Sequence, residues 1–571
     1  MTRLLVIFSL TVLLLIGYAH PITAMTQDLG RHLLTGKMIL ATHHISRVNL
    51  FSYTYPNFPF LNHHWLSQVI FYLVFAASGT TGLFALKLLI VGLLFLLLVR
   101  AVYGQTSLTA LLVSSLLSFP VLFERTDIRP ELFSFLLLAV FVIILRQYKQ
   151  KPTPLLLLLV PLEMLWVNLH IYFIVGIGLY GIFAIDEIWT HRQKLSHSHT
   201  VFFFLVFFLT CLAALVNPHW LTGALYPLLV FKNYGYSIEE NQNIFFLQNY
   251  YFHWSIFFFE TLVTVGFCSF LLTARKRSLA DWLTLLAFTY IGASAVRNMP
   301  LSAIALFIPL TLSLTDNFQS LKAYLTGQKH VFTALAWSLT LFLAIVALWQ
   351  GTQKGIGYQV APGAERGVDF LEKQHITGRI FNNFDIGSYL IYRLYPKERV
   401  FVDGRPEAYP ASFFRNTYIP MQEEPKLFDS VVKHYGISVI FFAHTDQTPW
   451  ATSFLGTILK NPSWQPVYFD DYVIILLKKI PANMRVLARF GMTERTLQAT
   501  LPKHPSSRQL LQIAYFFDRA GETTQAITAY ARLLNHDALS CPALTRLAAL
   551  ESGVNPLLAR LYTQEAQRLC R

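Results

Sequence analysis

The sequence predicts an α-helical polytopic membrane protein of about eleven spans, followed by a small α/β domain and a C-terminal helical repeat segment. The 571-residue chain is 54% hydrophobic and only 13% charged, whereas soluble domains carry about 25% charged residues. Apolar runs of about 17–25 residues, the length that crosses a bilayer, recur through residues 1–350. Beyond residue 350, short apolar strands alternate with helical stretches. These three observations together predict the class.

The apolar runs are interpreted as helices, because only helices and closed barrels satisfy the backbone in lipid. They lie near residues 4–24, 80–102, 107–123, 131–146, 154–169, 171–189, 200–216, 253–273, 281–296, 299–315 and 331–350. The run 65–78 is shorter, and we interpret it as a helix at the membrane interface or packed into the bundle. The first run also resembles a cleavable signal peptide, with residues 22–24 as the cleavage site. Its length favours a retained span.

Loop charge predicts that the N-terminus lies inside, because Lys and Arg gather in the loops that this orientation places inside. The clusters at 146–151 and 275–277 are two examples. An odd number of spans then leaves the C-terminal domains outside, which in a bacterium means beyond the inner (cytoplasmic) membrane. The net charge of +14 has the same explanation. Since the basic residues lie in short loops between apolar runs, we expect contact with membrane lipid and no nucleic acid partner.

The polar segment 25–66 separates the first two apolar runs, and it is long for a connection in a compact fold. We hypothesise that it forms the floor of an active site on the outer face, with Asp28 as the acid/base residue. The segment also holds the pairs His43-His44 and His63-His64. Adjacent residues rarely coordinate one ion together, and no HxxxH or HExxH spacing is present. The role of these pairs and any need for a metal stay open at this point.

Other polar side chains fall on the same predicted outer face, at the ends of later spans. Ionisable groups at membrane depth are costly and usually mark a pathway or a site. The candidates for substrate binding are His32, Arg125, Asp127, Arg129, His170, His219 and Arg297. Two alternatives stay open. The charged residues at 125–129 could form salt bridges that tie two helix ends together, and His170 and His219 could be interfacial histidines with satisfied hydrogen bonds.

A carboxylate beside a cluster of Arg, His and Asn suits one kind of chemistry. The carboxylate can deprotonate a hydroxyl or amine acceptor, and the cations can hold a phosphate leaving group, for which arginine offers a bidentate fork. A donor built on a lipid phosphate would enter from the bilayer between helices. This combination predicts glycosyl transfer from a polyprenyl-phosphate sugar to an acceptor on the outer face of the membrane.

A family resemblance adds to this prediction. The runs DLGRHLLTGKMIL and VNLFSYTYPNFPFLNHHWLSQVIFYL, followed by RPELFSF, WVNLH and VNP, resemble bacterial glycosyltransferase-like membrane proteins of unknown substrate, within the GT-C superfamily of polytopic glycosyltransferases. The resemblance covers residues 1–350. It implies a catalytic acid in the first outer loop, a place that Asp28 occupies, acting as a base or as the ligand of a divalent metal. It also implies phosphate or acceptor contacts for Arg125, Arg129 and Arg297.

One departure from the family pattern keeps a second function open. Many members carry two adjacent acids in the first loop, whereas Gln27 and Leu29 flank Asp28 here. The alternative is a catalytically inactive GT-C-like membrane assembly or binding protein.

Residues 351–482 are predicted to form an α/β domain. Short apolar runs at 379–384, 399–404 and 438–443 are typical of buried strands, the stretch 464–479 of a β-hairpin, and the segments near 386–394, 407–418 and 425–435 of helices. Polar residues follow two of these strands, where α/β folds place sites. They are Asn382, Asn383 and Asp385 after one strand, and Asp403, Arg405 and Glu407 after another. For Asp403 and Arg405 we favour a buried ion pair that orders the loop.

Residues 483–571 are predicted to be a helical tail. Ala514, Gly521, Ala526 and Tyr530 have spacings that resemble one tetratricopeptide repeat, in which small residues let two helices approach. Fewer than three repeats make a poor independent solenoid. We therefore expect a packing or docking appendage that could bind a protein partner. Cys541 and Cys570 bracket the last helical pair and could form a disulfide in an oxidising compartment.

Overall fold

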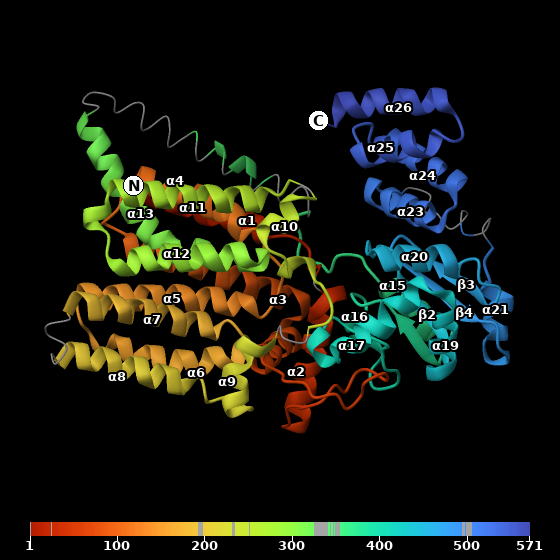
Figure 1. Cartoon of the computed structure of the whole chain (residues 1–571), viewed down its shortest axis with the longest axis horizontal. Coiled ribbons are helices and arrows are strands. Elements are labelled where there is room, and N and C mark those ends of the chain that lie inside the picture. Colours follow the sequence, from red (N-terminus) through yellow and green to blue (C-terminus); the bar gives the residue numbers. More distant parts are fainter. Residues whose placement is uncertain are drawn as a thin grey trace.

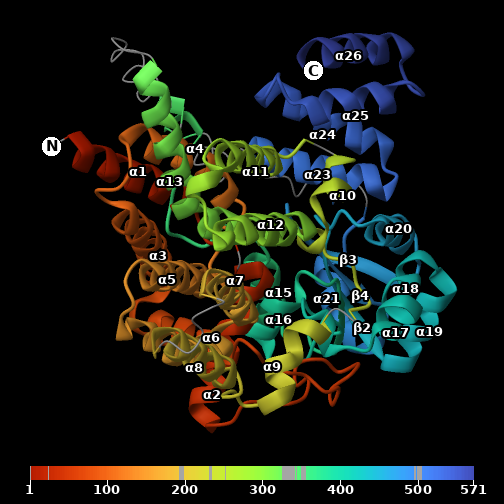
Figure 2. The ribbon, with the colours of Figure 1, turned by 60° about the vertical axis from the view of Figure 1, so that its left-hand side comes forward.

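The computed structural model has three parts: a bundle of long apolar helices, an α/β domain at one end of that bundle, and a stack of short helices on the α/β domain (Figure 1). It describes residues 2–23, 25–191, 198–230, 234–250, 252–324, 355–493 and 505–570, together with single positions between 338 and 348 and Leu497. The bundle helices run roughly parallel, and α16 lies between the bundle and the sheet (Figure 2).

The bundle is built from helices that follow the predicted apolar runs closely. They are α1 (Thr2–Tyr18), α3 (Trp65–Val102), α4 (Leu108–Leu122), α5 (Glu131–Gln150), η2 (Pro154–Leu158), α6 (Leu159–Leu169), α7 (Phe173–His191), α8 (Ser198–Ala213), α9 (Trp220–Leu229), α10 (Ile244–Gln248), α11 (Trp254–Leu272), α12 (Leu279–Ser294) and α13 (Met299–Tyr324). Within the described residues, five helices are long and apolar enough to cross a membrane, and six apolar helices are shorter. The run 331–350 lies almost entirely outside the described residues, so eleven spans stay a prediction.

A break at Gly79, whose φ is 60°, divides α3 into two helices, in agreement with the shorter helix predicted at 65–78 before the run 80–102. The apolar helix α9 was not predicted. Aromatic packing holds the centre of the bundle: the ring of Phe95 lies 5.2 Å from that of Phe119 and 6.0 Å from that of Phe307. Rings at these distances and steep angles pack edge to face.

The first polar segment is not a loop throughout, which corrects the sequence interpretation. A short π-turn, η1 (Met25–Leu29), leads into α2 (Gly30–Thr42). This helix lies directly on the start of α3: a Cβ at Gly36 would come within 2.1 Å of the Gln68 carbonyl oxygen. Glycine at this position therefore permits the close contact, and α2 holds the residues after Asp28 against the bundle.

The predicted strand at 399–404 is wrong. The backbone of Val400 bonds instead to the first polar segment: its N–H donates to the Phe51 carbonyl at 3.0 Å, and its carbonyl accepts from the Tyr53 N–H at 3.1 Å. A distant stretch of chain thus occupies the edge that a neighbouring strand would need. This pairing ties residues 43–64 to the α/β domain.

The α/β domain contains a four-stranded sheet in the order β1-β2-β4-β3. Its strands are β1 (Arg379–Asn382), β2 (Ile437–Ala443), β3 (Trp464–Phe469) and β4 (Val473–Lys478). β1 and β2 are parallel, and the other pairs are antiparallel. The predicted strands at 379–384 and 438–443 and the hairpin at 464–479 are confirmed. Buried side chains on both faces explain why β2 and β4 appear in the sequence as continuous apolar runs.

Helices cover both faces of this sheet. They are α15 (Glu365–Lys373), α16 (Gly387–Leu394), η7 (Pro406–Ala408), α17 (Ala411–Phe413), η8 (Phe414–Tyr418), α18 (Pro420–Glu423), α19 (Pro425–Tyr435), α20 (Pro449–Ile458), η9 (Pro481–Asn483) and α21 (Met484–Phe490). Helix α16 packs on α2 and η1 and so joins the domain to the bundle. The helix predicted near 407–418 is broken into short turns around buried aromatic rings.

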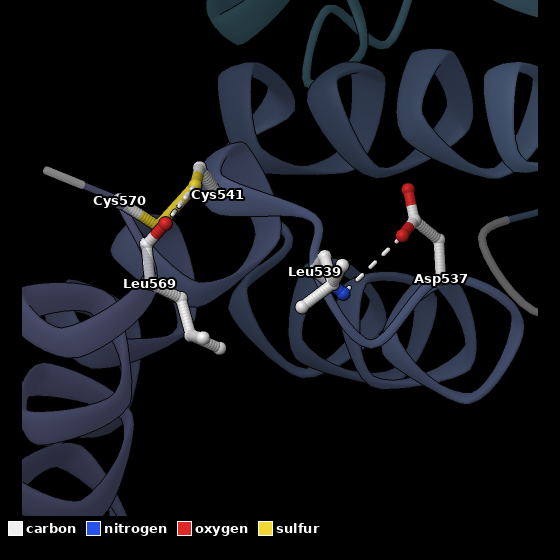
Figure 3. Close-up of a disulfide and its surroundings, with 5 residues drawn as sticks. All are labelled: Asp537, Leu539, Cys541, Leu569 and Cys570. Atoms are coloured by element: carbon white, nitrogen blue, oxygen red, sulfur yellow. Dashed lines mark hydrogen bonds between the residues drawn. A yellow bond between two sulfur atoms is a disulfide. The ribbon is translucent and has the colours of Figure 1, made fainter.

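The tail forms two helical hairpins, α23 (Ser507–Ala520) with α24 (Thr523–His536) and α25 (Cys541–Glu551) with α26 (Pro556–Leu569). Gly521 ends α23 in a left-handed conformation with φ at 78°. The turn between α23 and α24 needs this conformation, which glycine adopts without strain. The tail docks on the α/β domain through Phe516, whose ring lies 4.5 Å from that of Phe469. Cys541 and Cys570 form a disulfide that joins the start of α25 to the end of α26 (Figure 3).

We expect the disulfide to stabilise the last hairpin by about 3–4 kcal/mol, because it closes a loop across a sequence separation of 29 residues. Cys541→Ser should therefore speed amide hydrogen exchange in α25 and α26, whereas Cys268→Ser, which removes a free cysteine of the bundle, should not. Alkylation of unreduced, unfolded protein provides a direct check. Modification of Cys541 before reduction would contradict the assignment.

Candidate functional site

A cavity of about 1400 Å³ lies where the bundle meets the α/β domain. The bundle contributes η1, the start of α2, the turn between α4 and α5, α7, and the short turns η4 (Glu239–Asn241) and η6 (Val296–Asn298). The α/β domain contributes the loops that follow β1 and β2 and the loop around Gly404. The cavity therefore lies at the carboxyl ends of two parallel strands, where α/β folds usually place sites.

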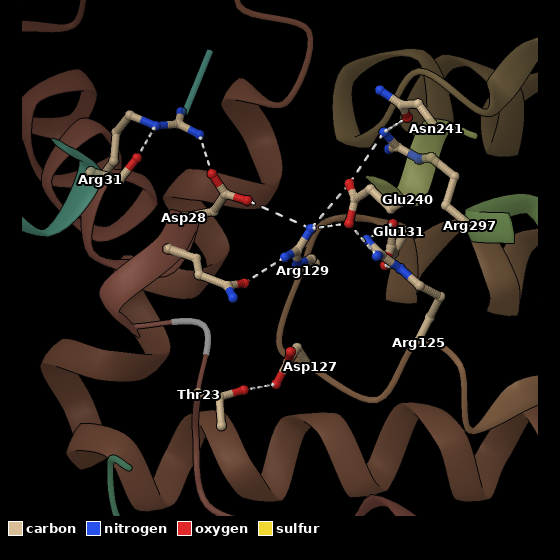
Figure 4. Close-up of polar contacts among 12 residues, drawn as sticks. Thr23, Asp28, Arg31, Arg125, Asp127, Arg129, Glu131, Glu240, Asn241 and Arg297 are labelled. Carbon is tan, nitrogen blue, oxygen red and sulfur yellow. Dashed lines mark hydrogen bonds and ion pairs between the residues drawn. The ribbon is translucent and has the colours of Figure 1, made fainter. Parts of the chain in front are cut away.

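Asp28 lies in η1 with 24% of its side chain exposed, and it is held by two arginines (Figure 4). Its Oδ1 accepts a hydrogen bond from Arg31 Nη2 at 3.2 Å, and its Oδ2 lies 3.6 Å from Arg129 Nη1. Close packing positions this turn: a Cβ at Gly30 would lie 2.9 Å from Tyr392 Cβ on α16. Both oxygens of Asp28 thus face guanidinium groups.

Glu240 is the centre of the charge network. It accepts from Arg125 at 2.5 Å and from Arg129 at 3.1 Å, and it lies 3.5 Å from Arg297. Burial alone would raise the pKa of Glu240, but Arg129, Arg125 and Arg297 outweigh that effect and hold the pKa far below its usual range. Glu240 is therefore an anion that lets three guanidinium groups lie close together.

The network keeps a positive charge. Arg125 also binds Glu131 through two bonds of 2.5 and 3.1 Å. Counting Arg31, the cluster brings together four guanidinium groups and three carboxylates, those of Asp28, Glu131 and Glu240, which leaves one net positive charge. Arginines in such a wall present forks that match phosphate oxygens.

Four histidine rings lie beside the arginines. Ring centroids are 5.5 Å apart for His32 and His64, 3.7 Å for His63 and His64, and 5.7 Å for His64 and His170. Burial lowers the pKa of His63 to about 3, and Arg297 and Arg31 add to the effect. This ring is therefore neutral at pH 7 and can donate or accept hydrogen bonds without adding charge. The pair His63-His64, whose role was open, lines the cavity, whereas His43 and His44 are exposed at the end of α2.

Six of the eight site residues predicted from the sequence line the cavity. They are Asp28, His32, Arg125, Arg129, His170 and Arg297. The other two do not. Asp127 accepts a hydrogen bond from the Thr23 hydroxyl at 2.6 Å, and the His219 N–H donates to Asn217 Oδ1 at 2.8 Å. The alternative of salt bridges among residues 125–129 is not observed among the described residues: Arg125 and Arg129 pair with acids outside that stretch, namely Glu131, Glu240 and Asp28, and both arginines line the cavity.

The wall formed by the α/β domain was not assigned to the site from the sequence. It presents Asp385, Arg405, Glu407 and Asp446. Arg405 makes the buried ion pair with Asp403 that was favoured above, at 2.6 and 2.8 Å. The sequence signal for this wall was the set of polar residues after β1, including Asp385. Nothing in that pattern could indicate that this edge of the sheet faces the bundle.

An apolar slot continues from the charged end of the cavity into the bundle. It lies between α7, which contributes Ile174, Gly178 and Ile182, and α12, which contributes Phe288 and Ile291. A Cβ placed at Gly178 would have no heavy atom within 4 Å, so the slot is open there. The cavity therefore joins an apolar channel to a charged chamber that contains the arginine cluster.

The cavity residues do not form an evident metal site. Among the described residues, no group of three or more His, Cys, Asp or Glu side chains has a geometry that could hold a metal ion. Both oxygens of Asp28, the ligand that the family resemblance implied, are engaged by arginines. The residues around Asp28 thus do not fit a divalent metal.

The fold is similar to that of solved membrane glycosyltransferases. The archaeal oligosaccharyltransferase AglB from Archaeoglobus fulgidus, solved with an inhibitory peptide and a dolichol-phosphate, matches 93% of this chain and 86% of its own length, with a TM-score of 0.56 and 12% identity. The oligosaccharyltransferase of the same organism, tethered to an acceptor peptide, matches 82% of this chain and 72% of its own, with a TM-score of 0.54 and 12% identity.

No family model matches the sequence, and no curated protein does. At 12% identity the solved structures establish the fold alone. Together with the five apolar helices, this shared fold makes the chain a multi-pass membrane protein with the architecture of a membrane glycosyltransferase.

We expect Glu240→Gln to destabilise the site by about 2 kcal/mol, less than a fully buried ion pair would cost, because a quarter of the side chain is open to the cavity. The substitution removes the anion between three arginines and leaves their repulsion uncompensated. Thermal unfolding in detergent should show a lower midpoint. Glu423→Gln, which changes an exposed acid of α18, should leave the midpoint within a degree or so of wild type. Equal midpoints for both variants would contradict the role given to Glu240.

Proposed function

We propose that this protein is a membrane glycosyltransferase that moves a sugar from a polyprenyl-phosphate donor to an acceptor on the outer face of the membrane. The observation that carries the proposal is the continuity of the cavity. An apolar slot between α7 and α12 leads into a chamber with four arginines and Asp28. A prenyl chain, a phosphate and a reacting sugar need these three environments in this order.

The donor phosphate would bind among the arginines. The cluster keeps one net positive charge after its internal ion pairs, and Arg297 also donates to Asn241 at 3.0 Å and to the Tyr172 hydroxyl at 3.1 Å. These bonds hold its guanidinium group in place, which favours binding of an anion without a cost in side-chain ordering. Neutral His63 and the other rings supply further hydrogen bonds. The solved complex of AglB with a dolichol-phosphate supports a lipid phosphate as the donor class.

The reaction would be a displacement with inversion. The acceptor hydroxyl or amine attacks the anomeric carbon from the side opposite the phosphate, and the bond between that carbon and the phosphate oxygen breaks. The arginines stabilise the charge that develops on the departing lipid phosphate. Asp28 orients the acceptor by accepting a hydrogen bond from it and assists removal of its proton.

We further propose that the chain lies in a bacterial inner membrane, with its N-terminus inside and the cavity outside. Residues 1–350 then form the membrane domain, 351–482 an outer α/β domain and 483–571 a tail that could bind a protein partner. The positive-inside bias of the loops supports this orientation. In it, the donor reaches the cavity from the bilayer and the acceptor from the external side.

A second candidate, a catalytically inactive assembly or binding protein of the same fold, is favoured by one observation. Asp28 has both oxygens facing arginines, an arrangement that a purely structural ion cluster would also show. The charge network would then only hold the α/β domain to the bundle.

Asp28→Asn distinguishes these functions. We expect the variant to lose transfer by about 100-fold or more, because it removes the carboxylate that contacts the acceptor, while the protein stays folded. The assay would use purified protein in lipid nanodiscs with a panel of radiolabelled polyprenyl-phosphate sugars. Asp369→Asn, an exposed acid of α15, is the control. Unchanged turnover or unchanged cellular function in Asp28→Asn would refute the catalytic assignment.

Gly178→Leu tests the lipid slot. The new side chain would occupy the open space beside Gly178 and displace part of a prenyl chain. Loss of two buried methylene groups costs about 1.6 kcal/mol, so we expect KM for a long-chain donor to rise about tenfold or more. Gly181→Leu, on the same helix with space toward α8 and outside the cavity lining, should have little effect. A similar KM for both variants would place the prenyl chain elsewhere.

A further inference from the structure

We propose that Asp385 of the α/β domain takes the proton that the acceptor loses, so that a carboxylate from outside the membrane domain completes the reaction centre. This inference rests on the proposed function and deepens it by naming a second acid. The observations that carry it are the placement of Asp385 on the cavity wall and the absence of a hydrogen bond or ion pair to its side chain among the described residues.

The loop after β1 is held rigidly in place. Asn383 donates from Nδ2 to the Ala443 carbonyl and to Asp446 Oδ2, both at 3.0 Å, and its Oδ1 accepts from the Ala443 N–H at 2.9 Å. The Phe384 N–H donates to the buried Tyr418 hydroxyl at 2.7 Å. The two residues that precede Asp385 are thus both fastened to other parts of the α/β domain. A loop fastened in this way positions a side chain without further ordering.

The Asp385 side chain is exposed into the cavity from this loop. It makes no hydrogen bond or ion pair within the part of the chain that the structure describes. Asp446 on the same wall differs, since it accepts from Asn383 and from the Thr448 N–H at 3.0 Å. Asp28 differs as well, because guanidinium groups face both of its oxygens. Of these three acids, Asp385 is the one whose oxygens are available to a proton.

Asp385 and Asp28 lie in one chamber although they belong to different domains. The α/β domain approaches closely: Arg31 Nε lies 3.4 Å from Ser388 Oγ on α16, and a Cβ at Gly404 would lie 3.4 Å from Asp28 Oδ1. Both carboxylates line the same cavity, one from each domain. An acceptor bound between the two domains can therefore contact both.

The electrostatic surroundings suit proton uptake near neutral pH. Burial within the protein raises the pKa of Asp385 most, Asp446, Asp28 and Glu240 raise it further, and Arg129 opposes them, with a result of about 7. A carboxylate with a pKa near the working pH is an effective general base. Arg129, Arg125 and Arg297 keep Glu240 charged, which separates its role from that of Asp385.

The step balances without another reactant. The acceptor oxygen or nitrogen forms a bond to the anomeric carbon, and the bond from that carbon to the phosphate oxygen breaks, with the electron pair leaving on the lipid phosphate. The acceptor proton moves to an Asp385 oxygen. After the product leaves, Asp385 returns the proton to water through the cavity mouth.

The test is the pH dependence of transfer by the full-length protein in nanodiscs, measured as kcat/KM with the donor and acceptor identified in the panel assay. Because the base must be unprotonated, the wild type should gain activity as pH rises through about 7. Asp385→Asn should lose about 100-fold or more at pH 8 and lose this rising limb. Asp385→Glu should keep the limb with reduced activity, and Asp369→Asn should match the wild type.

A second measurement does not depend on turnover. Infrared difference spectra of the wild type, recorded across the same pH range, should show a carboxylic acid band that disappears near pH 7 and is missing in Asp385→Asn. A rising limb or a band that persists in Asp385→Asn would overturn the inference. Activity of Asp28→Asn equal to wild type would instead overturn the proposed function, so the two failures are distinguishable.

Discussion

Four guanidinium groups lie together at one end of an apolar bundle, and carboxylates must balance their charge. The rest of the structure depends on this constraint. Unpaired, these charges would repel one another and require water around each of them. Glu240 lies between three of them, and Glu131 and Asp28 take the remaining contacts. The residues of this network come from η1 and the start of α2, from the turn between α4 and α5 with the first residue of α5, from η4 and from η6. One ion cluster therefore positions four separate stretches of chain around a single cavity.

The junction with the α/β domain depends on this arrangement. Helix α16 packs on η1 and α2, and residues 51–53 bond to the backbone of Val400. Tyr236, from the segment before Glu240, stacks on Phe384 with ring centroids 4.3 Å apart. The segment that carries Glu240 therefore contacts the α/β domain beside Asp385, and both walls of the cavity share one set of contacts.

Different parts of the resulting cavity are lined by side chains of different polarity and charge. Apolar side chains of α7 and α12 line its depth, arginines and neutral histidines its middle, and carboxylates of the α/β domain its other wall. In the proposed reaction this order separates the donor, which is anionic and lipid-linked, from the acceptor, which gives up a proton. The division arises because the two domains contribute different walls of the cavity.

Local sequence pattern was sufficient to predict many of the helices and strands of this protein. Long apolar runs predicted the bundle helices, period and turn residues predicted β1, β2 and the hairpin, and Asp28 with the arginines was identified from its place after the first run. The strand predicted at 399–404 was wrong, because residues 51–53, hundreds of positions away, bond to Val400. Helix α2 was missed because it depends on packing against α3 and α16. Only the tertiary structure decided that His63-His64 and Asp385 share a cavity with Asp28, since the docking of α16 on η1 is a packing contact that no local pattern encodes. Composition and period determine which segments are apolar helices or strands. The meeting of their polar ends is decided by long-range packing and charge compensation.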